Sequence, residues 1–211
     1  MKICTLCPRM CAVDRKSGER GICGQTTEIK VARAALHFWE EPCISGEMGS
    51  GAGFFSGCAL HCVFCQNENI ANGTAGKVIS TERLGEIFLE LQEKGANNIN
   101  LVTPGQFVPQ IIKAVELARN QNLKIPIVYN TSSYENVDTI RSLEGIVDIY
   151  LPDFKYFDTA LSAKYSHAPD YPAVAKAVIA EMVRQTGAAF FENGEDSLMK
   201  RGTIVRHLIL P

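Results

Sequence analysis

The sequence predicts an α/β fold in which the strands of a parallel sheet alternate with crossover helices. Past residue 65, short apolar runs rich in β-branched residues alternate with segments of helical periodicity, which is the pattern of such folds. With 211 residues, 46% of them hydrophobic and 21% charged, the chain can form one main globular domain. All eight cysteines lie in the first 65 residues. We therefore expect a cysteine-rich N-terminal arm, residues 1–45, and an α/β core, residues 46–211.

Five strands and four helices account for this core. The first helix is the clearest, because it has Ser80 or Thr81 as its N-cap, Gly95 at its end, and four apolar residues at helical spacing: Leu84, Ile87, Phe88 and Leu91. The second helix has Val108, Ile111, Ile112 and Val115 at the same spacing, and further helices are expected near residues 134–143 and 172–186. The strands are predicted at residues 53–56, 99–102, 125–129, 147–151 and 203–210, the last after a polar turn containing Asn193 and Gly194. Since such folds bind ligands at the carboxyl ends of their strands, the loops that follow the strands are the candidate site.

Charge and hydropathy exclude several classes of protein. The net charge of −2 argues against the broad basic surface that nucleic-acid binding requires, so no nucleic acid is expected as a partner. No apolar run approaches the roughly 18 residues of a membrane span, and the first residues lack the apolar core of a secretory signal. We therefore expect a cytoplasmic protein without a membrane partner. In that reducing compartment, eight cysteines are expected to be metal ligands rather than disulfides.

Three cysteines follow the first predicted strand. Cys58, Cys62 and Cys65 are spaced four and then three residues apart, close enough for one loop to bring three thiolates to one cluster. Iron–sulfur cubanes usually take four cysteines, so a trio leaves one iron open to another ligand. The alternative for these residues is structural cysteine or a partial zinc site.

With Phe64 before the third cysteine, this loop resembles the signature of the radical S-adenosylmethionine (radical SAM) superfamily. The stretches 54–58, 65–67, 129–132 and 148–155 resemble, more narrowly, the group similar to pyruvate formate-lyase activating enzyme. The resemblance implies a partial (β/α) barrel, a [4Fe-4S] cluster on the three cysteines, and SAM bound to the fourth iron. It also implies a 5′-deoxyadenosyl radical that takes hydrogen from an unknown substrate, and an electron donor such as flavodoxin or ferredoxin. A partner protein that carries a glycyl radical is one candidate substrate. Barrels of this superfamily have six strands and we count five, so the core is expected to be truncated before its last strand.

The same resemblance assigns residues to SAM. Asp153 is expected at the ribose hydroxyls and Lys155 at the carboxylate, against the alternative of a plain surface ion pair. The loop after the second strand, Thr103-Pro104-Gly105-Gln106, replaces the Gly-Gly-Glu that receives the SAM ammonium, so backbone carbonyls or Gln106 would accept those bonds. Further candidates for SAM or substrate are Asn130, Ser132 and Arg206.

The second group of cysteines is Cys4, Cys7, Cys11 and Cys23. Four thiolates suffice for a closed site, whether it holds zinc or a second iron–sulfur cluster, and unliganded thiols are the alternative. We expect these four to converge separately, well away from the loop trio. Cys43 has no partner at ligand spacing and is expected to be a small buried residue. If neither group acts on SAM, the protein would be a non-catalytic electron-transfer or metal-binding module.

Overall fold

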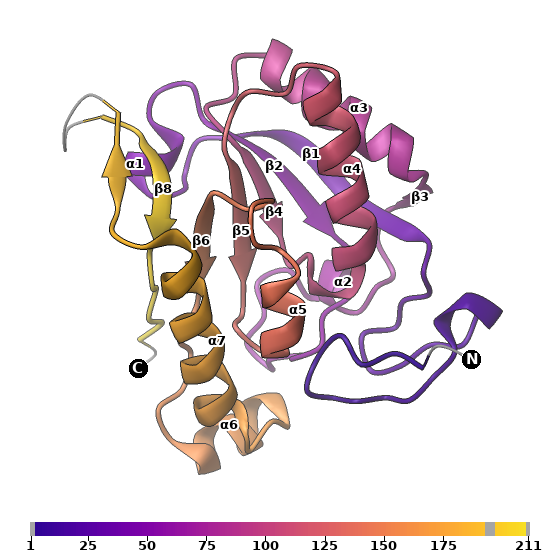
Figure 1. Ribbon diagram of the computed structural model, residues 1–211. Helices are drawn as coiled ribbons and strands as arrows, with labels where there is room; N and C mark the ends of the chain where they lie inside the picture. Colours follow the sequence, from indigo (N-terminus) through magenta and orange to yellow (C-terminus); the bar gives the residue numbers. More distant parts are fainter. Residues whose placement is uncertain (1–2, 193–196, 210–211) are drawn as a thin grey trace.

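The computed structural model describes residues 3–192 and 197–209 (Figure 1). These residues include one eight-stranded sheet in the order β3-β1-β2-β4-β5-β6-β8-β7. The strands are β1 Ile29–His37, β2 Ser50–Phe55, β3 Lys77–Ile79, β4 Ile99–Val102, β5 Ile127–Thr131, β6 Ile149–Pro152, β7 Phe190–Phe191 and β8 Met199–Thr203. The α-helices are α1 Pro42–Ser45, α2 Glu68–Ala71, α3 Thr81–Glu93, α4 Val108–Asn120, α5 Val137–Arg141, α6 Thr159–Ser166 and α7 Tyr171–Thr186.

The five strands β2, β4, β5, β6 and β8 are mutually parallel and follow one another in chain order across the sheet. Helices α3, α4, α5 and α7 connect them, and Figure 1 shows these helices in front of the sheet. This confirms the predicted α/β class with a mostly parallel sheet. Strands in chain order with their helices on one face are the arrangement of a partial (β/α) barrel.

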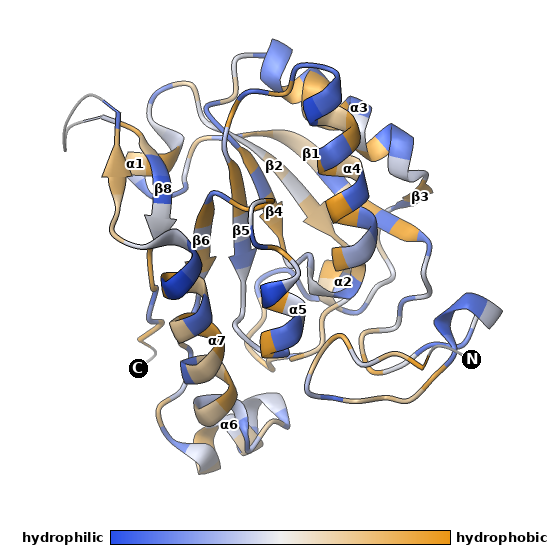
Figure 2. Cartoon of the chain, viewed as in Figure 1, coloured by the Kyte–Doolittle hydropathy of each residue, from blue (hydrophilic) through white to orange (hydrophobic). Residues whose placement is uncertain are grey.

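Successive side chains of a strand point to opposite faces of the sheet, so each face buries a different set of residues. Ile99 and Leu101 on β4 pack in the main core beneath the helices, as do Phe88 of α3 and Ile111 of α4. Apolar residues of α3 and α4 accordingly form stripes toward the sheet in Figure 2. A smaller cluster contains the alternate residues of β5 and β6, covered by α1 and β8: Ile44, Val128, Ile149, Leu151 and Met199.

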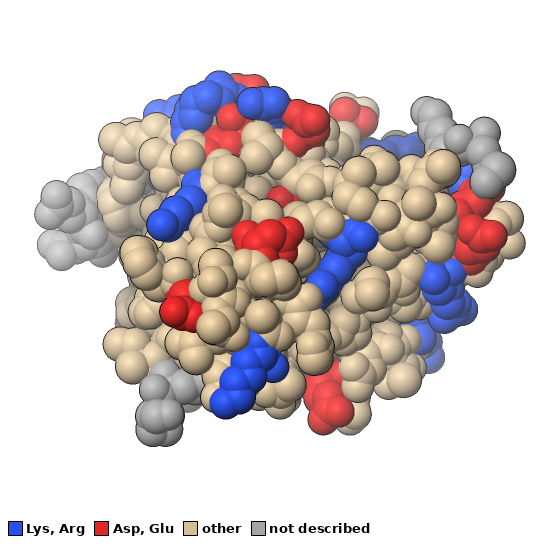
Figure 3. All heavy atoms as spheres, turned by 90° about the horizontal axis from the view of Figure 1, so that it is seen from below, with Lys and Arg blue, Asp and Glu red and all other residues tan. Residues whose placement is uncertain are grey.

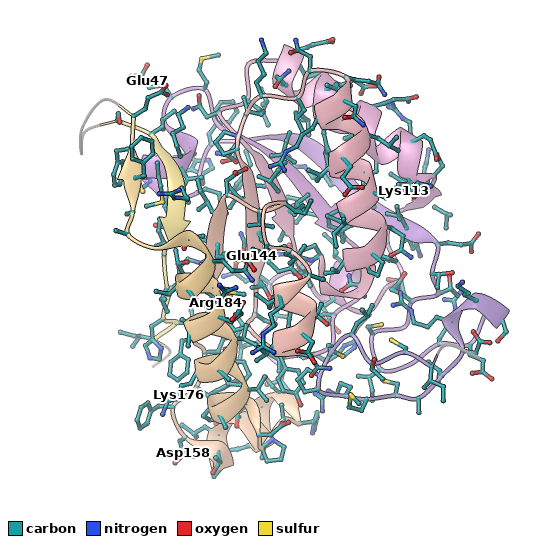
Figure 4. The ribbon with its side chains drawn as sticks, viewed as in Figure 1. Glu47, Lys113, Glu144, Asp158, Lys176 and Arg184 are labelled. Carbon is teal, nitrogen blue, oxygen red and sulfur yellow. The ribbon has the colours of Figure 1, made fainter. Side chains whose placement is uncertain are left out.

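The predicted helices are found close to their expected positions. Helix α3 begins after Ser80, whose hydroxyl accepts a hydrogen bond from the Arg83 amide, and it ends before Gly95, which has a φ of 86°. Helix α7 is joined to the segment after α5 by an Arg184–Glu144 ion pair of 2.9 Å, and Figure 4 shows these two side chains pointing toward one another. No helix of the described segments is long and apolar enough to cross a membrane.

Three strands that sequence analysis did not predict extend the sheet at its edges. Strand β1, within residues 1–45, pairs antiparallel with β2 and β3, and β7 pairs antiparallel with β8. The last parallel strand covers residues 199–203 rather than 203–210, and its Gly202 and Thr203 pair with Ile149 and Tyr150. Past this strand the amides of Ile204 and Arg206 still donate to the carbonyls of Tyr150 and Pro152, and Arg206 forms an isolated bridge to Asp153. The expected turn at Asn193 and Gly194 lies outside the described residues, as does Leu210.

Candidate active site

The three-cysteine loop leaves the carboxyl end of β2, the end at which β4, β5 and β6 also finish. Gly57 opens the loop with a φ of 87°, and a Cβ at this position would collide with the carbonyl oxygen of Cys23. The Gly57 amide donates to the Ile70 carbonyl at 2.8 Å, and the Val63 amide donates to the Tyr165 carbonyl at 2.9 Å. A left-handed glycine and two long-range hydrogen bonds therefore fix the path of the loop.

The thiols of this loop lie together in an apolar setting. Burial raises the pKa of Cys58, and Cys62 and Cys65 raise it further because an ionised Cys58 would repel their negative charge. Leu60 is fully buried between them, and the Phe64 ring packs on Tyr156 with centroids 6.2 Å apart. The three thiols are partly buried and close together, and they can become thiolates together when a metal centre supplies positive charge. The donor set thus fits an iron–sulfur cluster.

Beside the loop, the carboxyl ends of β5 and β6 carry a network of charged and amide groups. The carboxylate of Asp153 accepts from Lys155 Nζ at 2.7 Å and from Arg206 Nε at 2.8 Å. The Arg206 guanidinium also donates to Asn130 Oδ1 at 2.7 Å. Of the residues predicted to contact SAM, these four lie in one network. Asp153 and Lys155 are each about one-fifth exposed or less, so they are not a plain surface pair.

Glu40, which was not predicted from the sequence, also belongs to this network. Its carboxylate lies 3.6 Å from Arg206 Nη1 and accepts from the Asn130 amide at 3.3 Å. Burial raises the pKa of Glu40, and the charge of Arg206 opposes that rise. Glu40 comes from the loop after β1, a strand that the sequence did not predict. No local pattern could have identified it.

Tyr171, at the start of α7, was also missed. Its hydroxyl oxygen lies 2.9 and 2.8 Å from the carbonyl oxygens of Ser132 and Asp153, which share its one proton, and it accepts from the Lys155 amide at 2.8 Å. One buried side chain thus holds the ends of β5 and β6 together. Ser132 enters the site through its backbone carbonyl. A tyrosine that begins a helix gives no sequence signal for such a role.

Gln106 has a different position from the predicted SAM residues on β5 and β6. Its amide nitrogen lies 2.9, 3.0 and 2.9 Å from the carbonyl oxygens of Ser56, Gly57 and Thr103, which share its two N–H groups. These bonds join the end of β2 to the end of β4 directly beneath the cysteine loop. In this structure Gln106 braces the loop.

The N-terminal cysteines lie against this site. Burial raises the pKa of Cys7 to about 12, with further contributions from Cys23, Cys11 and Cys4, so the four thiols are neighbours. A cavity of about 40 Å³ is lined by Cys4, Cys7 and Cys23 together with Cys58 of the loop. The expectation that the two cysteine groups lie well apart is therefore wrong, because the arm folds onto the loop. Cys43 lines a separate surface groove at the opposite end of the strands.

Among residues 3–192 and 197–209, no three His, Cys, Asp or Glu side chains are close enough together to hold a single metal ion. Figure 3 shows the face toward which the parallel strands point. On that face, Lys and Arg alternate with Asp and Glu among uncharged residues, without a large patch of one sign.

Comparison with known proteins agrees with this geometry. Residues 53–184, which include the cysteine loop and the strands from β4 to β6, match the model of the radical SAM superfamily. The whole chain is 27% identical, over 217 residues, to an uncharacterized protein of Methanocaldococcus jannaschii. The chain spans 57% of the length of that relative. The chain thus belongs to the radical SAM superfamily.

Proposed function

We propose that this protein is an enzyme that binds a [4Fe-4S] cluster through Cys58, Cys62 and Cys65 and uses it with SAM. When bound together, cluster and SAM supply a 5′-deoxyadenosyl radical, and the substrate loses a hydrogen atom to it. The observation that carries the proposal is the placement of the three-cysteine loop beside the network of Asp153 and Lys155, at the carboxyl ends of parallel strands. Membership of the superfamily supports the same reaction class.

The network explains how this chain would hold SAM. An ammonium has three donors, and the structure uses one donor of Lys155 on Asp153, which leaves the others for a carboxylate of the ligand. Asp153 would accept from the ribose hydroxyls while Arg206 and Tyr171 fix its side chain and backbone. Asn130, held by Arg206 and Glu40, would present its amide to SAM or substrate.

The proposal extends to the substrate and the electron donor. The resemblance of residues 148–155 to activating enzymes supports a reaction in which a partner protein gains a glycyl radical, with flavodoxin or ferredoxin as the electron donor. The second candidate is a non-catalytic iron–sulfur or zinc protein. The open iron distinguishes the two, because a fourth protein ligand on the loop cluster would favour the module.

The test is anaerobic reconstitution with iron and sulfide, followed by reduction in the presence of SAM and measurement of 5′-deoxyadenosine. We expect the wild type to form this product and Cys62→Ala to form none. Cys43→Ala is the matched control, because Cys43 lies outside both cysteine groups and should leave product formation unchanged. A cluster-loaded wild type that forms no 5′-deoxyadenosine would favour the non-catalytic module.

A further inference from the structure

The N-terminal arm, here residues 3–28, is fastened to the cysteine loop by side chains from both segments. Arg9 donates through Nε to the Ala59 carbonyl at 2.9 Å and through Nη2 to the Ser166 carbonyl at 2.9 Å. His61 Nε2 lies 2.9 Å from the Ile22 carbonyl, next to Cys23. With Gly57 against the Cys23 carbonyl, the two cysteine groups meet along a shared boundary.

Backbone amides are directed at the arm sulfurs. The Ile22 amide donates to Cys11 Sγ at 3.3 Å, and the amides of Arg9 and Gln25 donate to the sulfurs of Cys7 and Cys23. In the loop, Cys58 Sγ likewise accepts from the Leu60 amide, at 3.4 Å. Neutral thiols are weak acceptors, whereas thiolates bound to a metal gain from such donors. Three of the four arm sulfurs therefore have the surroundings of metal ligands.

Arg15 gives an independent indication of negative charge at this place. Its side chain is buried, yet no carboxylate of the described chain pairs with it. It donates to the carbonyls of Gln25 and Gln106, at 3.1 and 2.7 Å, and one guanidinium nitrogen lies 3.9 Å from Cys4 Sγ. A buried cation without a counter-charge is costly, and a centre held by four thiolates would supply that charge.

The spacing of the sulfurs bears on the kind of centre. Ligands of one zinc ion lie roughly 3.8 Å apart, since each Zn–S bond is about 2.3 Å long. No three cysteines of the described residues are close enough together to hold one ion, and this is true of the superfamily's own loop trio as well as of the arm. Neither group therefore has the spacing of a single-ion site. A polynuclear cluster suits neighbouring thiols that are too far apart for one ion.

From these observations we infer that Cys4, Cys7, Cys11 and Cys23 bind a second, four-cysteine iron–sulfur cluster that lies directly against the loop cluster, with Arg15 as its buried counter-charge. The contact between the two clusters rests on the proposed function, because it requires a cluster on the loop. The arm cluster itself does not depend on that function. Both groups line the same cavity, which Leu6 and Ala59 also border.

The test is iron and acid-labile sulfide per chain after anaerobic reconstitution, with and without the loop cysteines. We expect about eight irons in the wild type and in Cys43→Ala, and about four in the variant with Cys58, Cys62 and Cys65 all changed to Ala. Arg15→Gln should lower the iron content of this triple variant, because it removes the counter-charge. Zinc, or no metal, in a folded triple variant would overturn the inference.

The contact between the clusters has its own measurement. The electron paramagnetic resonance spectrum of the fully reduced wild type should be broadened by spin coupling. It should differ from the sum of the spectra of the triple variant and of a Cys7→Ala, Cys23→Ala variant. A spectrum equal to that sum would refute the contact. If a variant fails to fold, the iron content of the wild type is the deciding measurement. About four irons would overturn the arm cluster even when 5′-deoxyadenosine is formed. About eight irons without this product would contradict only the proposed function.

Discussion

Lys155 is the residue on which the proposed orientation of SAM depends most directly. Its ammonium is largely buried, and its one described partner, Asp153, is itself shared with Arg206. Arg206 also faces Glu40, so Lys155 is the cation of this network that has donors left for a ligand carboxylate. This residue therefore carries the sharpest test of the proposed SAM orientation.

We expect Lys155→Ala to weaken SAM binding by about 1.5–3 kcal/mol, the range for a hydrogen bond to a charged group, while the loop cluster still assembles. Asp153→Asn should cost less, because the amide oxygen still accepts one hydroxyl bond. Calorimetric titration of SAM into reconstituted protein measures both effects. Lys124→Ala, an exposed lysine at the other end of the strands, is the control. Unchanged SAM affinity in the Lys155 variant would contradict the assignment of Lys155 to the SAM carboxylate.

Glu135 is a residue whose charge opposes folding. Its buried carboxylate accepts from the hydroxyls of Tyr129 at 2.7 Å and Thr131 at 2.5 Å, and no Lys or Arg of the described residues forms an ion pair with it. Burial raises its pKa, and the two hydrogen bonds only partly oppose this rise. The folded protein therefore holds this proton more tightly than the unfolded chain does.

Because the pKa of Glu135 is raised on folding, its contribution to stability is full below the ordinary carboxyl pKa and is lost as the pH rises through the raised value. We expect the free energy of unfolding of the metal-free protein to fall between pH 5 and pH 7.5, and Glu135→Gln to reduce that fall. Denaturant titrations at both pH values give the comparison. Glu86→Gln, an exposed glutamate on α3, should keep the full pH dependence. The same fall in both variants would show that Glu135 does not cause it.

At the scale of elements, the arm depends on contacts with other parts of the chain. Within residues 3–28 the structure has a single short 3-10 helix, Arg15–Ser17, and exposes Ile3, Met10 and Ile22. An element with so little core of its own is stabilised by docking and by metal. Arg9 is the main docking residue, since its guanidinium reaches three carbonyls and lies 5.0 Å from the centroid of Tyr134.

We expect Arg9→Ala to release the arm without unfolding the sheet. Amide hydrogen exchange of residues 3–28 should then become faster, while exchange in α3 and α4 keeps its wild-type rate. Lys16→Ala, in the same arm but exposed, is the matched control. Wild-type exchange in the arm of the Arg9 variant would mean that other contacts suffice to hold it.

At the scale of the whole molecule, Tyr171 joins the last long helix to two strands that lie 39 and 18 residues earlier in the chain. It also packs on Tyr156 and Tyr134 in a second core beneath the cysteine loop. This core is continuous with the loop through Leu60. Loss of the Tyr171 hydroxyl should therefore affect both stability and the site.

We expect Tyr171→Phe to lower the free energy of unfolding by about 1–3 kcal/mol, because the buried hydroxyl is the donor that two carbonyls share and the acceptor of one amide. SAM binding should weaken as well, since Asp153 and Lys155 lose the group that fixes their backbone. Denaturant unfolding with an unchanged m value and SAM titration test the two effects. Tyr165→Phe is the control, because the Tyr165 hydroxyl makes no hydrogen bond with other described residues. Equal stability of the two variants would contradict the role of Tyr171.

The sequence by itself determined the parallel core and the cysteine loop, since both follow from local patterns: periodicity for α3 and α4, strand runs for β4 and β6, and thiol spacing for Cys58, Cys62 and Cys65. Only the tertiary structure decided which residues meet. It added β1 and Glu40, made Tyr171 a link between strands, turned Gln106 into a brace, and placed the arm against the loop. Contacts of this kind join segments far apart in the chain, and their energy depends on burial and geometry that no short stretch of sequence encodes.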